Sequence, residues 1–172
     1  MRVPVVHSFA PVARADARVL VLGSMPGAAS LEAGRYYAHP RNAFWPIVGT
    51  LCGVPADAPY ERRLAALHDA GIALWDVLRS CARDGSLDGD IEAGSARPND
   101  FAAFLPTLPR LRVVACNGGT ALRWFRRVAA ALPATVAAPA ILALPSTSPA
   151  NAGRTPAQKL AAWRAALEPH LP

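Results

Sequence analysis

A run of seven residues from Ala17 to Gly23, ARVLVLG, is the feature that most restricts the fold. Its aliphatic and β-branched side chains stop at a glycine, and this pattern predicts a short strand buried on both faces. Three similar runs follow, IALWDVL at 72–78, LRVVACNGG at 111–119 and AILALPSTSPAN at 140–151, the last two running on into turns. Strands buried on both faces are typical of a parallel sheet covered by helices.

Helical patterns separate these strands. AFWPIVGTLCG at 43–53 has a proline near its start, and APYERRLAALHDAG at 58–71 spaces its apolar side chains three to four residues apart. TALRWFRRVAAAL follows the third strand, and TPAQKLAAWRAALEPHL begins with Thr155 as N-cap and Pro156 in its first turn. We therefore predict one α/β domain over residues 1–172, a three-layer α/β/α fold with a central four-stranded, mainly parallel sheet.

Composition restricts the class of protein. The chain has 172 residues, 52% of them hydrophobic and 17% charged, as expected for a globular domain rather than a disordered chain. No apolar run approaches the ~18 residues that span a bilayer, and the N-terminus lacks the cleavage pattern of a signal peptide. The sequence therefore predicts a cytoplasmic protein.

The charge balance and the cysteines bear on partners and cofactors. The net charge of +6 favours a polyanionic partner such as nucleic acid, although an arginine-rich composition can also reflect the genome. Cys52, Cys81 and Cys116 are far apart and form no C-x-x-C pair. We expect reduced, buried thiols, with no disulfide framework and no zinc or iron–sulfur site.

Polar clusters stand where the four strands end: GSMPG after the first, WD after the second, NGG after the third and PSTSPAN after the fourth. Ligands of open α/β sheets bind beyond the carboxyl ends of the strands, so these clusters predict the site. GSMPGAAS can cradle an anion with backbone N–H groups, or it can be a simple tight turn. PSTSPAN can contact phosphate through its hydroxyls, or it can be a solvated loop.

In combination these segments indicate a family. The loop GSMPGAASLEAGRYYAHPRNAFW resembles the first motif of the uracil-DNA glycosylase superfamily. With LPSTSPAN and LWDVLRSCARDGSLD it is similar to the hypoxanthine-DNA glycosylase branch, in the correct order from residue 19 to residue 153. The resemblance implies a uracil-DNA glycosylase-like fold and a monofunctional enzyme that excises deaminated bases, above all hypoxanthine, in base excision repair. We expect a monomer that acts on single- or double-stranded DNA without metal or organic cofactor.

The resemblance also assigns roles in the first motif. Such an enzyme extrudes its base from the stack and holds it against an aromatic ring, and Tyr37 falls at that position; a core role is the alternative. For Tyr36 the two roles are evenly balanced. Relatives place an aspartate or asparagine before the loop proline to activate water, but here Met25 stands there, and a thioether cannot do this. Asn42 is the predicted substitute, positioning water or polarising the leaving base, although it can also cap the following helix.

Two residues at strand ends are candidate readers of the base edge. Asp76 aligns with an asparagine that reads pyrimidine edges in relatives, and as an acceptor it can receive N1–H of hypoxanthine. Equally, it can be a strand-end carboxylate bonded to backbone. Asn117 is a second candidate reader, with an Asn-Gly turn as the alternative. Met25 is expected to contact the base only as an apolar group.

The remaining assignments concern DNA phosphates and the leaving base. Leu144 replaces a histidine that stabilises the departing base in uracil-excising relatives, so efficient uracil excision is not expected. His39 is expected to brace its loop rather than to act as an acid. Lys159, in the last helix, is not placed to form a Schiff base, so strand cleavage is not expected. The predicted phosphate contacts are Ser24, Gly27, Arg41, Ser146, Thr147, Ser148 and Asn151.

Three alternatives stay open at this point. Within the same fold, the preferred base could be uracil or xanthine. A catalytically silent domain that binds damaged or single-stranded DNA is motivated by Met25 and Leu144, which replace expected catalytic groups. A Rossmann-like nucleotide-binding enzyme is suggested only by LGSMPG, which lacks a complete glycine fingerprint.

Overall fold

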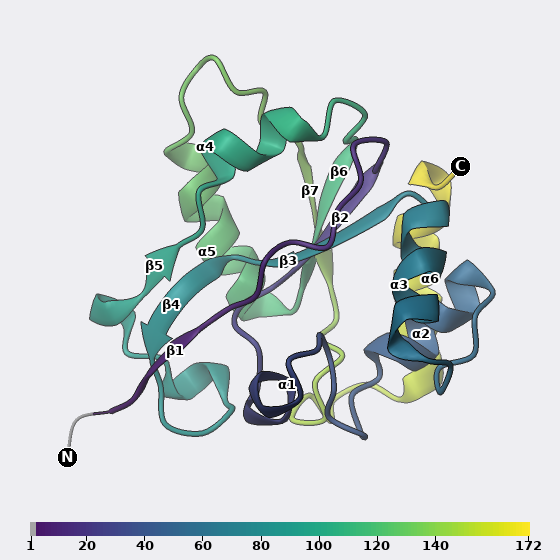
Figure 1. Ribbon diagram of the computed structural model, residues 1–172, viewed down its shortest axis with the longest axis horizontal. Coiled ribbons are helices and arrows are strands. Elements are labelled where there is room, and N and C mark those ends of the chain that lie inside the picture. Colours follow the sequence, from purple (N-terminus) through teal and green to yellow (C-terminus); the bar gives the residue numbers. More distant parts are fainter. Residues whose placement is uncertain (1–2) are drawn as a thin grey trace.

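The computed structural model describes residues 3–172 and contains two sheets with helices packed around them (Figure 1). The central sheet has four parallel strands in the order β3-β2-β6-β7. Its strands are β2 (Val19–Gly23), β3 (Ile72–Asp76), β6 (Val113–Asn117) and β7 (Ala140–Leu144). The predicted four-stranded parallel sheet is thus confirmed.

Helices cover both faces of this sheet and give the three predicted layers (Figure 1). One face packs against α2 (Phe44–Cys52), α3 (Tyr60–Asp69) and α6 (Pro156–Leu167), and the other against α4 (Phe101–Phe104) and α5 (Gly119–Ala130). Strand β2 supplies side chains to both cores in alternation, Val19 and Val21 to the first and Leu20 and Leu22 to the second. All four are fully buried, which explains the continuous apolar run in the sequence.

A second, antiparallel sheet was not expected from the sequence. It has the order β1-β4-β5 and consists of β1 (Val5–His7), β4 (Leu78–Ala82) and β5 (Arg97–Pro98). The predicted strand at 72–78 is therefore wrong at its end, because the chain leaves the central sheet after β3 and continues as β4. The N–H of Val77 donates to the carbonyl of Gly23, and β4 then pairs with the N-terminal strand.

The loop after β2 also contains more structure than expected. Residues Ala28–Ala33 form the short helix α1, which ends at Gly34 in a left-handed conformation. Six residues are too few to show helical periodicity, so the sequence pattern did not reveal this helix. Short 3-10 turns complete the chain: Asp88–Asp90, Ala93–Ser95, Leu105–Thr107 and Glu168–His170.

Helix α6 holds the segment that follows β7, residues 145–151, through hydrogen bonds from two of its side chains. The indole Nε1 of the fully buried Trp163 donates to the carbonyl oxygen of Pro145 at 2.9 Å. Lys159 is also buried, and its Nζ donates to the carbonyl oxygen of Asn151 at 2.8 Å. At the start of the helix Thr155 forms the predicted N-cap, completed into a capping box by Gln158. The 145–151 segment is thus fixed by contacts with the core.

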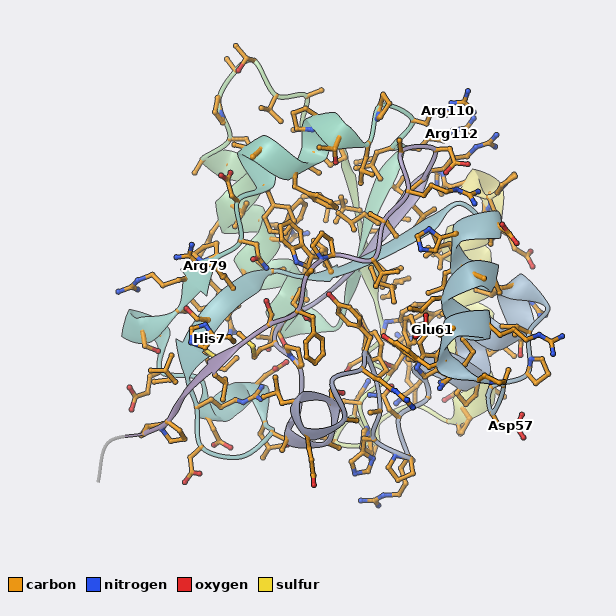
Figure 2. The ribbon with its side chains drawn as sticks, in the orientation of Figure 1. His7, Asp57, Glu61, Arg79, Arg110 and Arg112 are labelled. Carbon is orange, nitrogen blue, oxygen red and sulfur yellow. The ribbon has the colours of Figure 1, made fainter. Side chains whose placement is uncertain are left out.

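Most charged side chains lie at the surface of the molecule, and the buried exceptions among the described residues are Asp76, Arg83 and Lys159. Figure 2 shows Arg79, Arg110, Arg112 and Asp57 directed outward, and all four are exposed. Within residues 3–172, no helix is both long and apolar enough to cross a membrane.

Two helical glycines give a test of this packing. A Cβ added at Gly49 in α2 would lie 2.5 Å from the carbonyl oxygen of Val54, whereas a Cβ at Gly119 in α5 would meet nothing within 4 Å. We expect Gly49→Ala to lower the free energy of unfolding by about 1–3 kcal/mol, because backbone must move. Gly119→Ala should leave it unchanged or raise it by up to about 1 kcal/mol. Urea denaturation of both variants measures this, and equal effects would contradict the packing of α2.

Candidate active site

A cavity of about 840 Å³ opens at the carboxyl ends of the central strands. The loop after β2, the end of β3, the end of β6 and the 145–151 segment all contribute to its wall, as the strand-end rule predicts. All the site residues predicted from the sequence line this cavity: Ser24, Met25, Gly27, Tyr37, Arg41, Asn42, Asp76, Asn117, Ser146, Thr147, Ser148 and Asn151.

Tyr37 presents an aromatic face to the cavity. Its ring stacks on Phe44 with a centroid separation of 3.8 Å and an interplanar angle of 14°, so Phe44 covers one face of a side chain that also lines the cavity. Among the described residues it is the only non-glycine with a positive φ, 54°. That conformation is strained for a bulky side chain, and such strain often accompanies function. Tyr36, by contrast, is a core residue whose hydroxyl donates to the carbonyl of Ala10.

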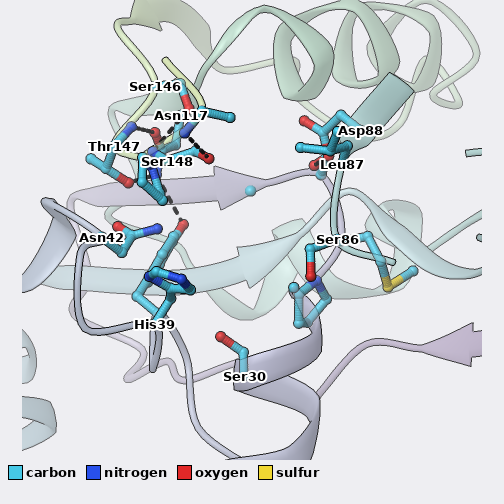
Figure 3. A pocket seen from close by; sticks show the side chains of 18 of the residues that line it. Ser30, His39, Asn42, Ser86, Leu87, Asp88, Asn117, Ser146, Thr147 and Ser148 are labelled. Atoms are coloured by element: carbon cyan, nitrogen blue, oxygen red, sulfur yellow. Dashed lines mark hydrogen bonds between the residues drawn. The ribbon is translucent and has the colours of Figure 1, made fainter. Parts of the chain in front are cut away.

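Asn42 stands at the end of a tight turn that begins at His39. The carbonyl of His39 accepts the N–H of Asn42 at 2.9 Å, and His39 Nδ1 accepts the N–H of Arg41 at 3.1 Å. Asn42 Oδ1 accepts the N–H of Phe44 at 2.9 Å, which forms an Asx turn just before α2, whose N-cap residue is Ala43. Figure 3 shows the amide nitrogen of Asn42 facing the cavity beside His39. The amide therefore binds the first N–H of α2 with its oxygen and offers its N–H groups to a ligand.

Asn117 holds the 145–151 segment against the end of β6. Its Nδ2 donates to Thr147 Oγ1 at 2.8 Å, and its Oδ1 accepts the N–H of Thr147 at 2.9 Å (Figure 3). A second, longer hydrogen bond runs from Nδ2 to the hydroxyl oxygen of Tyr37 at 3.3 Å. Because Tyr37 accepts here, its own O–H is free to donate. The polar atoms of Asn117 thus engage Thr147 and Tyr37 in the structure.

Asp76 lies at the inner end of the cavity. Its side chain is 3% exposed, and Oδ2 has no hydrogen-bond partner within residues 3–172. An added Cβ at Gly23 would lie 2.6 Å from Asp76 Oδ1 and 3.3 Å from the hydroxyl of Tyr37, so only glycine fits between them. Burial, reinforced by the nearby charge of Asp88, raises the pKa of Asp76 to about 7. The side chain therefore changes its charge in the physiological range.

The residues not predicted from the sequence come from segment 84–90, whose residues 86–89 form the wall opposite the 145–151 segment (Figure 3). Ser24 Oγ donates to Asp88 Oδ1, and Ser86 Oγ accepts the N–H of Ala28 at 2.9 Å. These bonds tie the segment to the loop after β2. Leu87 at its tip is 55% exposed. These residues belong to the motif LWDVLRSCARDGSLD, which contributed to the family resemblance, but no local pattern in it indicated that they line the cavity.

Arg83 was also missed. It is 1% exposed, and its Nη2 donates to the carbonyl of Pro26 beneath the loop after β2. Its Nε and Nη1 have no partner in the described part of the chain. Its positive charge lowers the pKa of Asp76 and so opposes part of the effect of burial. A buried guanidinium therefore supports the loop and acts electrostatically on the cavity.

The two residues that replace expected catalytic groups are buried apolar side chains. Met25 packs with Leu78, Cys81 and Ala96, and Leu144 belongs to the core on the α2 face. In residues 3–172, no group of three or more histidine, cysteine or carboxylate side chains is arranged to hold a metal ion.

Comparison with known proteins gives consistent matches. The family model described as the uracil DNA glycosylase superfamily matches residues 10–167. Two curated proteins named hypoxanthine DNA glycosylase, from Methanosarcina acetivorans and Methanosarcina barkeri, are each 36% identical over 113 residues, which cover 65% of this chain and 70% of theirs. A solution NMR structure from M. acetivorans, provisionally named a uracil DNA glycosylase, superposes with a TM-score of 0.76 at 30% identity, covering 94% of this chain and 98% of that one.

The pairing of Asn117 with Thr147 can be tested by a double-mutant cycle. Each single change, Asn117→Ala or Thr147→Ala, should lower the free energy of unfolding by about 1–3 kcal/mol, because it leaves a buried polar partner unsatisfied. The double variant should lose less than the sum, with a coupling of about 0.5–3 kcal/mol. Urea denaturation gives the four values, and additive losses would show that the two side chains do not interact.

Proposed function

The chain belongs to the uracil DNA glycosylase superfamily and is a DNA glycosylase that hydrolyses N-glycosidic bonds, and we propose that hypoxanthine is the base it releases from DNA. The names of the two Methanosarcina relatives support this choice of base. The observation that carries the proposal is the pairing of an aromatic face with a hydrogen-bonding edge inside one cavity. The ring of Tyr37 and the carboxyl group of Asp76 both line this cavity, separated only by the small residue Gly23.

The extruded base stacks on Tyr37. Base–aromatic stacking contributes about 1–3 kcal/mol per base, and the ring is held in place before DNA arrives because Phe44 stacks on its other face. A platform that needs no rearrangement loses less entropy on binding. The strained backbone of Tyr37 is consistent with this role, since a core tyrosine would need no left-handed conformation.

Asp76 reads the edge of the base and accepts N1–H of hypoxanthine, while the thioether of Met25 makes an apolar contact nearby. Asn117 contributes indirectly, because its amide holds Thr147 and binds the hydroxyl of Tyr37, which helps to fix the stacking ring. The proposed reading edge is therefore the carboxyl group of Asp76.

Asn42 is the proposed catalytic residue. Its oxygen is engaged at the start of α2, so the part of the amide that faces the cavity is a donor. A donor cannot remove a proton, but it can hold the attacking water or polarise the leaving base. Bond breaking is then largely dissociative, and water meets a sugar oxocarbenium ion.

Hydroxyls and N–H groups that line the cavity are the proposed contacts to the DNA backbone. Phosphate contacts position a duplex without reading its sequence, and the proposed contacts are Ser24, Gly27, Arg41, Ser146, Thr147, Ser148 and Asn151. We further propose that the protein acts as a monomer, in the cytoplasm, on single- or double-stranded DNA. The buried Nζ of Lys159 donates to the carbonyl oxygens of Ser148 and Asn151. Its engagement there supports base release without a Schiff base and without strand cleavage.

A panel of duplexes that each contain one deoxyinosine, deoxyuridine or deoxyxanthosine tests the proposed base. We expect release of hypoxanthine to be the fastest and release of uracil to be slow, because Leu144 cannot stabilise the departing base as a polar group would. Chromatography of the freed bases under single-turnover conditions measures all three. Release of uracil alone would overturn the choice of hypoxanthine, and release of no base would favour a DNA-binding module.

Two substitutions at Asn42 separate its catalytic role from its role in the turn before α2. A serine hydroxyl can accept the same N–H, although more weakly, and has no amide, whereas alanine has neither group. We expect Asn42→Ser to keep the free energy of unfolding within about 0.5 kcal/mol of wild type, and Asn42→Ala to lose about 0.5–1.5 kcal/mol. Both should release hypoxanthine about 10²–10³-fold more slowly. Normal release by Asn42→Ser would restrict Asn42 to its role in the turn.

A further inference from the structure

The carboxyl group of Asp76 is buried in an arrangement that favours its neutral form. Oδ2 is enclosed without a hydrogen-bond partner within residues 3–172, and no ion pair of these residues includes Asp76. An ionised carboxylate in such a place would lose its hydration, and only the charge of Arg83 would offset part of that loss. In contrast, a neutral carboxyl group has one acidic proton to offer to a ligand in the cavity.

The groups that face Asp76 from the surrounding elements reinforce this. Asp88, in the 3-10 turn of segment 84–90, carries a like charge, and Tyr36 and Tyr37 are neutral hydroxyls whose own pKa values burial raises. Arg83 at the end of β4 is the opposing cation, but its guanidinium donates to Pro26. The pKa of Asp76 accordingly lies near 7.

Building on the proposed function, we propose that Asp76 works as a neutral carboxylic acid that recognises the lactam edge of the extruded base. Its hydroxyl donates to O6 of hypoxanthine while its carbonyl oxygen accepts N1–H, so that two hydrogen bonds close a ring. A carboxylate would make only the second bond and would repel O6. The substrate class is thus bases in which deamination has replaced an amidine edge by a lactam.

The same hydrogen bond assists the departure of the base. When the C1′–N9 bond breaks, its electron pair stays on the purine and negative charge spreads to O6, where the bond from Asp76 becomes stronger. The oxygen of water then bonds to C1′, and the proton that water loses neutralises the base. Asp76 ends the reaction with its own proton, so one water is consumed and hypoxanthine leaves.

The pH dependence of base release tests the proposal. Single-turnover release from a deoxyinosine oligonucleotide is measured between pH 5.5 and 8 for wild type, Asp76→Asn and Asp76→Ala. The wild-type rate should decline as pH rises, approaching tenfold per unit above pH 7. Asp76→Asn should show a flat profile, because its amide donates to O6 and accepts N1–H without titrating. Asp76→Ala should be flat and about 10²–10³-fold slower than wild type at pH 6.

Two neighbouring carboxylates provide controls. Asp88→Asn removes the like charge, so its decline should begin at lower pH than in wild type. Asp84 is exposed and lies outside the cavity, so Asp84→Asn should follow the wild-type profile. A wild-type rate that rises through this pH range would overturn the proposal, because the carboxylate would then be the working form. A wild-type profile as flat as that of Asp76→Asn would do the same.

Thermal unfolding gives a readout that does not depend on catalysis. The pKa of Asp76 is higher in the folded state than in the unfolded chain, so Asp76 lowers the free energy of unfolding of the wild type as pH rises from about 4 to 7. Asp76→Asn lacks this effect, so its Tm minus the wild-type Tm should increase with pH across this range. A constant difference would contradict a neutral Asp76. Failure of every variant to release hypoxanthine, with this Tm trend intact, would instead count against the proposed function.

Discussion

The cavity depends on the pairing of Gly23 with Asp76 at the carboxyl ends of β2 and β3. These residues are direct neighbours in the parallel register, and the missing side chain of Gly23 leaves the space into which the Asp76 carboxyl group and the Tyr37 hydroxyl extend. The carboxyl ends of parallel strands lie at one edge of the sheet, so Asn117 at the end of β6 lies at the same edge as Gly23 and Asp76. The register of β2 with β3 and β6 therefore determines which polar groups line the cavity.

Polar groups in this region are buried at a cost to stability. Asp76 and Arg83 both retain unpaired atoms, although buried polar groups in proteins are nearly always hydrogen-bonded. The two large apolar cores on either side of the sheet compensate for this cost, and the bonds from Trp163 and Lys159 fix the 145–151 segment on the other wall. The molecule thus combines well-packed apolar cores with a few buried polar atoms, in Asp76 and Arg83, that lack hydrogen-bond partners. Such departures from satisfied hydrogen bonding are expected at sites that bind a ligand.

The sequence predicted the central sheet and the helices α2, α3, α5 and α6 from their periodicity, and Asp76 and Asn117 from their place at strand ends. Tyr37 and Asn42 lie in a loop, and only the family resemblance assigned them to the site. It did not predict the sheet formed by β1, β4 and β5, whose pairing joins distant segments and leaves no local pattern. It also could not reveal that segment 84–90 closes the cavity or that Arg83 lies beneath it. The residue type of Asn117 is compatible with a base reader. Its observed hydrogen bonds to Thr147 and Tyr37 could not be predicted, because these partners are distant in the sequence.

The left-handed backbone at Tyr37 has an evolutionary consequence. Glycine or asparagine would relieve the backbone strain there, which costs about 1–2 kcal/mol. Either replacement would also remove the ring that stacks on Phe44 and the packing that this ring provides. Strain and packing therefore oppose each other at this position, and selection on the chemistry of the cavity acts together with packing to retain a tyrosine.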